Sequence, residues 1–83
     1  MVKVFYFARL REELGLASEE IALDPGIGNA GALAAKLAAR GGAWAVLAGG
    51  RNVRIAVNQD MAHAATPLKS GDEVAFFPPV TGG

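Results

Sequence analysis

One long helical pattern, at residues 30–40, stands between strand patterns on both sides, and this arrangement constrains the fold more than any other feature of the sequence. Leu33 and Leu37 are four residues apart and so share one helix face, alanines fill the positions around them, and a Gly-Gly pair ends the pattern. Asn29 is a good residue to cap the first turn. Because a single helix covers only one face of a sheet, the pattern predicts an α+β roll.

The strand patterns are runs of β-branched, aromatic or alternating residues, bounded by turn residues. They are predicted at residues 2–7, 19–23, 53–57 and 73–77, with short helical segments at 8–14 and 44–47. The segment around His63 suits a turn or a short edge strand. A chain of 83 residues can build one modest core. We therefore expect a mixed sheet of four to five strands, covered on one face by the main helix, in a single domain at residues 1–77.

Charge and composition disfavour several classes of function. Eight Lys and Arg residues balance eight Asp and Glu residues, so no overall field attracts nucleic acid or an acidic membrane surface. No apolar run approaches the roughly 20 residues of a membrane span. The N-terminus lacks the pattern of a signal peptide, so we expect a cytoplasmic protein. The chain has no cysteine and one histidine, His63, which leaves little for a metal site or for a self-sufficient enzyme.

The last six residues, 78–83, differ from the rest of the chain. Pro78 and Pro79 cannot donate ladder hydrogen bonds, so the final strand must stop and the chain is expected to project as a tail. Six extended residues reach roughly 20 Å, far enough to enter a cleft in another protein. Gly82 and Gly83 have no Cβ and leave the terminal carbonyl open to attack. Terminal glycines are often only frayed ends, and this pair becomes informative through its two-proline spacer.

The segment from Leu68 to Gly83, which ends in Asp-Glu-Val-Ala-Phe-Phe-Pro-Pro-Val-Thr-Gly-Gly, resembles the C-terminal signature of the MoaD family, the small subunits of molybdopterin synthase. Residues 2–12 resemble the opening strand and helix of that family, and residues 56–59 resemble the end of its central strand. The middle of the chain, residues 24–51, is less specific. The resemblance implies a β-grasp, ubiquitin-like fold.

The resemblance also implies a chemical cycle. An ATP-dependent, MoeB-like enzyme adenylates the carboxylate of Gly83, a sulfurtransferase supplies sulfur, and the thiocarboxylated tail enters the active site of a MoaE-like large subunit within a heterotetramer. There the sulfur passes to cyclic pyranopterin monophosphate and builds the dithiolene of molybdopterin. In this cycle the chain is a non-catalytic co-substrate without a metal or a permanently bound cofactor, and the acid-base groups belong to the large subunit.

Strand parity predicts a second functional feature, an exposed apolar patch. Phe5, Phe7 and Phe77 are expected on the sheet face that looks away from the helix, and such a patch on a small domain usually marks an interface. The alternative is that these rings fill a second, minor core beneath a loop. The resemblance favours the interface, and the contact residues that it implies are Phe7, Met61, Phe77, Pro78, Pro79, Val80 and Thr81.

Two other functions remain open from the residues alone. One is a different sulfur carrier of the same fold, either a ThiS-like protein for thiazole synthesis or a carrier that also conjugates to lysines. The double Phe and double Pro between Phe76 and Pro79 favour the molybdopterin carrier over a ThiS-like one. The other is a β-grasp interaction module whose tail is inert.

Overall fold

The computed structural model describes residues 1–47 and 53–78 of the chain. Within these ranges, five strands form one sheet and three helical segments connect them. The strands are β1 (Val2–Tyr6), β2 (Ser18–Ile21), β3 (Arg54–Val57), β4 (Asp60–Ala62) and β5 (Glu73–Phe77). The helical segments are α1 (Ala8–Leu14), α2 (Ala30–Ala38) and the 3-10 helix η1 (Gly42–Leu47).

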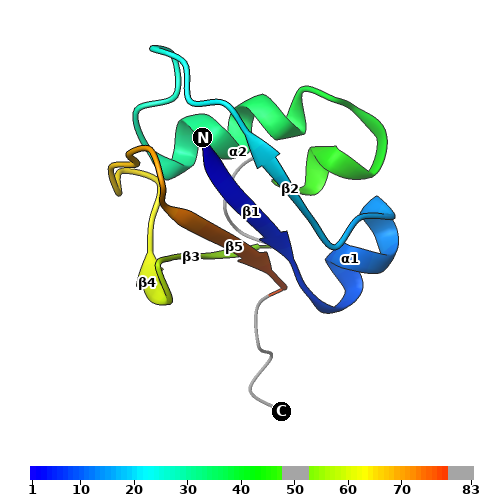
Figure 1. Ribbon diagram of the computed structural model, residues 1–83. Coiled ribbons are helices and arrows are strands. Elements are labelled where there is room, and N and C mark those ends of the chain that lie inside the picture. The colour runs from blue at the N-terminus through cyan, green and yellow to red at the C-terminus, as the bar shows by residue number, and fades with distance from the viewer. Residues whose placement is uncertain (48–52, 79–83) are drawn as a thin grey trace.

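The strands are arranged in the order β2-β1-β5-β3-β4, so the first and the last strand of the sequence lie side by side at the centre of the sheet (Figure 1). β1 and β5 run parallel, with Val4 opposite Val74. The pairs β1–β2, β3–β5 and β3–β4 run antiparallel. This is the mixed α+β sheet that the sequence predicts.

The hydrophobic core lies between α2 and one face of the sheet. Leu33 and Leu37 of α2 are buried and belong to one cluster with the inward-facing residues of the strands. Along the central strands, buried residues alternate with more exposed ones, as a half-covered sheet requires. The strand members of the cluster are Val2, Val4, Tyr6, Ile21, Ile55, Val57, Val74 and Phe76. The opposite face of the sheet, which carries Lys3 and Glu73, is left uncovered by α2.

The helix α2 begins as predicted and ends two residues early. The side chain of Asn29 accepts a hydrogen bond from the backbone N–H of Ala32 at 2.8 Å, which caps the first turn. The helix ends at Ala38, and Gly41 has φ +81°, a left-handed conformation that redirects the chain into η1. The helical segment predicted at 44–47 is therefore longer and begins at Gly42.

Several strand boundaries differ from the prediction by one or two residues. β1 ends at Tyr6 because residue 7 is the N-cap of α1, β2 begins at Ser18, which pairs with Phe5, and β3 begins at Arg54, which pairs with Phe77. β2 ends at Ile21 because Ile21 pairs with Val2, the first residue of β1, so residues 22–23 have no strand residue opposite them. The connection between β3 and β4 is a two-residue turn, because Asp60, the first residue of β4, pairs with Val57, the last residue of β3. Asn58 and Gln59 form this turn with φ values of 51° and 73°, as a tight two-residue hairpin requires.

The region around His63 matches its prediction. β4 is a short edge strand that ends at Ala62, and His63 follows it on the exposed surface. The Nδ1 atom of His63 accepts a hydrogen bond from the backbone N–H of Ala65 at 3.2 Å. This histidine therefore lies at the surface and has a hydrogen-bond partner within its own loop.

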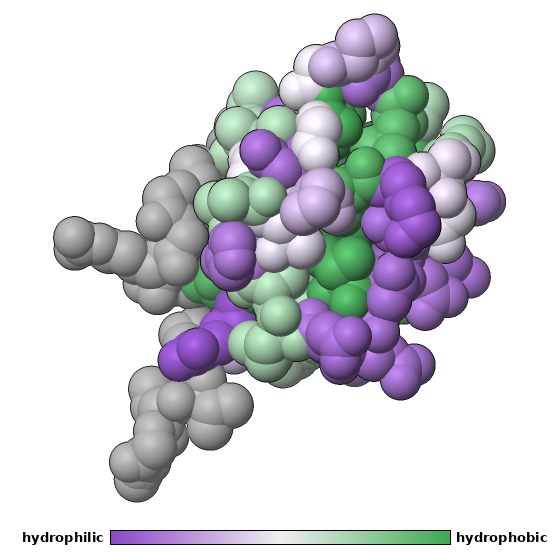
Figure 2. Space-filling view, turned by 90° about the vertical axis from the view of Figure 1, so that its left-hand side faces the viewer, coloured by the Kyte–Doolittle hydropathy of each residue, from purple (hydrophilic) through white to green (hydrophobic). Residues whose placement is uncertain are grey.

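The exterior is not uniformly polar. On the side of the molecule shown in Figure 2, hydrophobic residues form a band between hydrophilic ones. None of the helices in the described parts of the chain is long and apolar enough to cross a membrane.

Candidate functional site

The sheet face opposite α2 carries a row of apolar side chains. Phe5 of β1 lies beside Ala75 of β5, and Ala75 lies beside Ala56 of β3. Ala56 in turn pairs with Met61 of β4. Residues paired in register place their side chains on the same sheet face. One row therefore crosses four strands in the order Phe5, Ala75, Ala56, Met61, and we call this the apolar row.

The large apolar residues on this face reach the surface, as predicted. Met61 is 62% exposed and Phe7 is 47% exposed, while Phe5 and Phe77 are half-buried. Phe5 and Phe7 stack, with ring centroids 6.2 Å apart. Of the described residues that form the hydrophobic core, none is a phenylalanine of this patch. The rings thus form a surface patch, and the alternative that they fill a second core is wrong.

Hydrogen bonds hold the backbone of Phe7, whose ring is exposed. Its N–H donates to the carbonyl of Phe76 at 3.1 Å, and its own carbonyl accepts from the N–H of Leu10 at 3.1 Å. The next residue, Ala8, has φ 54°, a left-handed conformation that non-glycine residues seldom adopt. The chain therefore turns sharply from β1 into α1, and Phe7 stays at the surface at this corner.

The tail starts beside this corner. β5 ends at Phe77 and Pro78 follows it, in agreement with the predicted end of the strand. The predicted site residues Pro79, Val80, Thr81, Gly82 and Gly83 lie outside the described residues, so their roles stay predictions. Because the carbonyl of Phe76 binds the N–H of Phe7, the last described part of β5 is adjacent to the exposed patch.

A shallow depression lies within the patch, and sequence reasoning missed it. It has a volume of about 260 Å³. Its position depends on Ala56 and Ala75, which pair across the β3–β5 ladder. The alternation of side chains along each strand predicts the sheet face on which each alanine lies, but it does not predict that the two alanines pair. The residues that line it are Phe5, Phe7, Ala56, Gln59, Glu73 and Ala75.

A polar cluster on the core side of the sheet joins β1, β2, η1 and the turn that follows α2. The hydroxyl of Tyr6 donates to Oε2 of Glu19 at 2.8 Å, and Arg40 donates to both carboxylate oxygens of Glu19 at 2.8 and 2.9 Å. The guanidinium of Arg40 lies 4.4 Å from the ring centroid of Trp44. The hydrogen bonds from Arg40 lower the pKa of Glu19, and burial raises the pKa of Tyr6. All these groups bind one another, so the cluster has a structural role.

A second carboxylate, that of Asp72, is also committed to the fold. It is 4% exposed and accepts hydrogen bonds from Asn58 Nδ2 and from the backbone N–H of Lys69, both at 2.9 Å. The Asn58 bond is the main cause of a pKa below the ordinary value for this carboxyl, and the Lys69 bonds act in the same direction. Asp72 precedes β5, at the opposite end of that strand from Pro78, where the tail begins.

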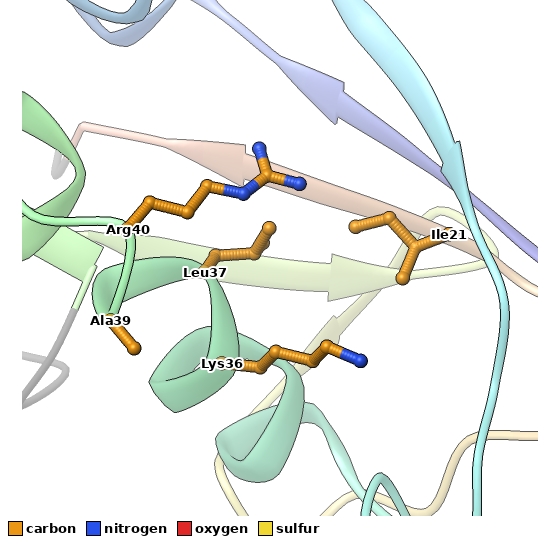
Figure 3. A pocket seen from close by; sticks show the side chains of 5 residues that line it. All are labelled: Ile21, Lys36, Leu37, Ala39 and Arg40. Carbon is orange, nitrogen blue, oxygen red and sulfur yellow. The ribbon is translucent and has the colours of Figure 1, made fainter.

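A cleft of about 230 Å³ lies between β2 and α2. Figure 3 shows Ile21 of β2 facing Leu37 of α2, with Lys36 and Arg40 on either side. Lys36 pairs with Asp24 at 3.0 Å, and Arg40 pairs with Glu19. The cations of this cleft are therefore balanced within the chain. Residues 1–47 and 53–78 also contain no group of three or more His, Cys, Asp or Glu side chains placed to hold a metal ion.

Known proteins resemble this chain along its whole length. The model of the ThiS family matches residues 4–83. The molybdopterin synthase sulfur carrier subunit of Escherichia coli (strain K12) is 43% identical over 83 residues, which cover all of both chains. The putative molybdopterin converting factor subunit 1 from Pyrococcus furiosus has 34% identity and a TM-score of 0.77, covering 95% of this chain and 97% of that chain.

A fourth likeness concerns a solved complex. The complex of subunits 1 and 2 of the molybdopterin-converting factor from Helicobacter pylori contains a chain with 28% identity and a TM-score of 0.67. The match covers 99% of this chain and 97% of that one. The sheet with α2 across one face is thus a ubiquitin-like β-grasp fold, as the resemblance implies. Since the family model covers all but the first three residues, the chain belongs to the ThiS family.

Proposed function

We propose that this protein is the sulfur-carrier subunit of molybdopterin synthase. The observation that carries the proposal is its full-length, 43% identity to a molybdopterin synthase sulfur carrier subunit. The double Phe and double Pro after residue 75 favour this carrier over a ThiS-like carrier for thiazole synthesis. The chain has no cysteine, so any sulfur that it carries must be bonded to its carboxyl terminus.

The chemistry that we propose takes place at Gly83. A free carboxylate is a poor electrophile, and adenylation by ATP converts it into an acyl adenylate with release of pyrophosphate. The sulfur of a persulfide on the sulfur donor then attacks the carbonyl carbon and displaces AMP, which gives an acyl disulfide. A second thiol attacks the donor sulfur of this sulfur–sulfur bond, forms a disulfide with it and releases the terminal thiocarboxylate. Glycine at positions 82 and 83 suits this role because no Cβ hinders the approach to the carbonyl. The activating enzyme would be MoeB-like, and a sulfurtransferase would supply the sulfur.

The open sheet face is the surface that we propose for docking on the large, MoaE-like subunit. Exposed apolar patches on small domains commonly mark protein interfaces, and Phe7 and Met61 are the most exposed side chains of this one. Phe77 belongs to the same face and immediately precedes the tail. A partner bound to this face would therefore lie close to the start of the tail. The solved complex of subunits 1 and 2 from Helicobacter pylori supports an assembly of this kind.

Acid-base catalysis is assigned to the large subunit. Glu19 and Asp72 are engaged by hydrogen bonds within the fold, and His63 binds the backbone of its own loop. General acid-base catalysis requires a group within hydrogen-bond reach of the reacting atoms, and these groups are committed elsewhere. The carrier's own contribution is a docking surface and a reactive terminus.

Removal of Gly82 and Gly83 tests the proposal. The truncated chain is combined with activating enzyme, ATP, a sulfur donor, the large subunit and cyclic pyranopterin monophosphate, and dithiolene formation is measured. We expect the truncated chain to fold and to bind the large subunit, because the open face is intact, but to deliver no sulfur. A chain to which the two glycines have been restored is the control. Full dithiolene formation by the truncated chain would rule out the proposal.

A further inference from the structure

The depression on the open face is apolar along its length and polar at one end. Ala56 and Ala75 form its floor, and their small side chains leave the space between Phe5 and Met61 unfilled. Phe5 forms part of its wall, and Glu73, two residues before Ala75 on the same strand face, lies at one end of it. Two residues along a strand span roughly 7 Å. The depression therefore suits an elongated side chain rather than a compact one.

The polar end carries a carboxylate without a cation. Among the ion pairs formed by residues 1–47 and 53–78, none includes Glu73, which is exposed. Its backbone N–H donates to Oδ1 of Asn58 at 3.0 Å, so its main chain is held while its side chain is not. Lys3 is its neighbour in β1, but the Nζ atom of Lys3 lies over the ring of Phe5, 5.4 Å from the centroid.

Docking on this face would change the surroundings of Glu73. A partner that covers Phe7 and Met61 also covers the depression, because Phe7 lines it and Met61 ends the apolar row. The carboxylate of Glu73 would then lose water, and an ionised group buried without a partner is costly. An apolar side chain from the partner would fill the depression but would leave this carboxylate unpaired.

We infer that the depression receives one arginine side chain of the large subunit, with its aliphatic part on Ala56 and Ala75 and its guanidinium beside Glu73. Long basic side chains bury their methylene groups against apolar surface while the charged head stays in contact with water or polar groups. A guanidinium also binds carboxylates through two parallel hydrogen bonds and stacks on aromatic rings such as Phe5, which favours arginine over lysine. This inference rests on the proposed function and names the chemistry of its interface.

The first test measures the dissociation constant between the carrier and the large subunit of the same organism by calorimetry at low and high salt. Glu73→Gln is compared with Glu20→Gln, which removes the same charge from an exposed residue on the same sheet face, at the edge strand β2. We expect Glu73→Gln to raise the dissociation constant about tenfold and to weaken its salt dependence, as the loss of a charged hydrogen bond predicts. Glu20→Gln should change it less than about twofold.

The variant Lys3→Met tests whether the cation beside Glu73 in the complex belongs to the partner or is Lys3 of this chain. If Lys3 moved onto Glu73 in the complex, Lys3→Met would weaken binding as much as Glu73→Gln does, and the inference would be overturned. We expect Lys3→Met to bind within about twofold of the unmodified chain, as for other charges at the rim of an interface.

A third variant, Ala75→Leu, fills the depression without removing charge. The leucine side chain has room on the open face, so the urea midpoint of unfolding should stay unchanged, while the dissociation constant should rise by about tenfold or more because the arginine no longer fits. Ala35→Leu, on the exposed side of α2, is the matched control. If the unmodified chain does not bind the large subunit, the proposed function fails; if it binds and Glu73→Gln and Ala75→Leu bind equally well, only this inference fails.

Discussion

The hydroxyl of Tyr6 donates a hydrogen bond to Oε2 of Glu19 at a distance of 2.8 Å, although Tyr6 itself is only 1% exposed. The bond joins the central strand β1 to the edge strand β2. Arg40 binds the same carboxylate and lies just beyond α2, so one carboxylate links both strands to the main helix. The ring of Trp44 in η1 packs edge-on against the ring of Tyr6, with centroids 5.3 Å apart, so η1 adjoins this cluster.

The first prediction concerns this hydroxyl. Tyr6→Phe keeps the buried ring but removes the donor, and we expect the free energy of unfolding to fall by about 1.5 to 3 kcal/mol, as for the loss of a hydrogen bond to a charged group. Urea unfolding followed by fluorescence of Trp44 measures this change. A variant with the same unfolding midpoint as the unmodified chain would show that the bond adds nothing to stability.

Acid should destabilise the protein through Glu19 and Asp72. Both carboxyls have pKa values below their ordinary ones, so below pH about 4 the unfolded chain binds more protons than the folded one. Their contribution to stability is therefore complete above the unfolded pKa and is lost as the pH falls through the folded pKa. Urea unfolding at a series of pH values from 7 to 2 measures the decline, which should be shallower in Asp72→Asn. An equal slope in the two proteins would exclude Asp72 as a source of the acid sensitivity.

Because of a close contact at the start of α2, we expect a Gly→Ala substitution there to destabilise the fold, whereas it normally stabilises a helix. A Cβ added to Gly31 would lie 2.9 Å from the Cβ of Ala64 and 3.0 Å from its carbonyl oxygen. Alanine normally favours a helix over glycine by up to about 1 kcal/mol. Here we expect Gly31→Ala to destabilise the fold by about 1 to 3 kcal/mol, because the backbone of Ala64 must shift.

Gly28→Ala is the matched control for Gly31→Ala. Apart from its own chain neighbours, no residue has an atom within 4 Å of the Cβ that it would add, so its thermal midpoint should stay close to that of the unmodified chain. If the two alanine variants melted at the same temperature, the contact between Gly31 and Ala64 would not constrain the packing of α2.

The apolar patch predicts that a charge at Phe77 blocks docking. Phe77→Asp places a carboxylate on the open face beside the tail, so association with the large subunit should be lost while the fold remains intact, since Phe77 lies outside the core cluster. Ala35→Asp adds the same charge on the exposed side of α2 and should bind normally. Binding by size-exclusion chromatography and circular dichroism would check the two expectations. Unchanged association of the Phe77 variant would remove this residue from the interface.

The local elements of this fold could be predicted from the sequence because their signals are local. The spacing of Leu33 and Leu37 and the cap at Asn29 located α2, and the strand β5 at residues 73–77 was predicted at its observed bounds. Alternation along β1 and β5 placed Phe5 and Phe77 on the open face. The predicted ends of β1, β2, β3, α2 and η1 differed from the observed ones by one or two residues, because these ends depend on the partner strand and on backbone conformation.

The features that the sequence could not show depend on pairing between distant segments. Glu19 and Arg40 are 21 residues apart, and no local sequence pattern indicates that their side chains form an ion pair. Likewise, Ala56 and Ala75 read as ordinary strand residues until the β3–β5 register places them side by side between Phe5 and Met61. Contacts between distant segments create both the polar cluster and the depression. The hydrophobic periodicity that predicts strands and helices, of two and 3.6 residues, carries no information about these contacts.

The most direct test of the account is an intact-mass measurement of the chain after incubation with its activating enzyme, ATP and a sulfur source. We expect a mass increase equal to the exchange of one oxygen atom for one sulfur atom, located in the C-terminal peptide and absent from the variant without Gly82 and Gly83. An unchanged mass, under conditions in which the enzyme forms the acyl adenylate, would contradict the claim that the terminus of this protein carries sulfur.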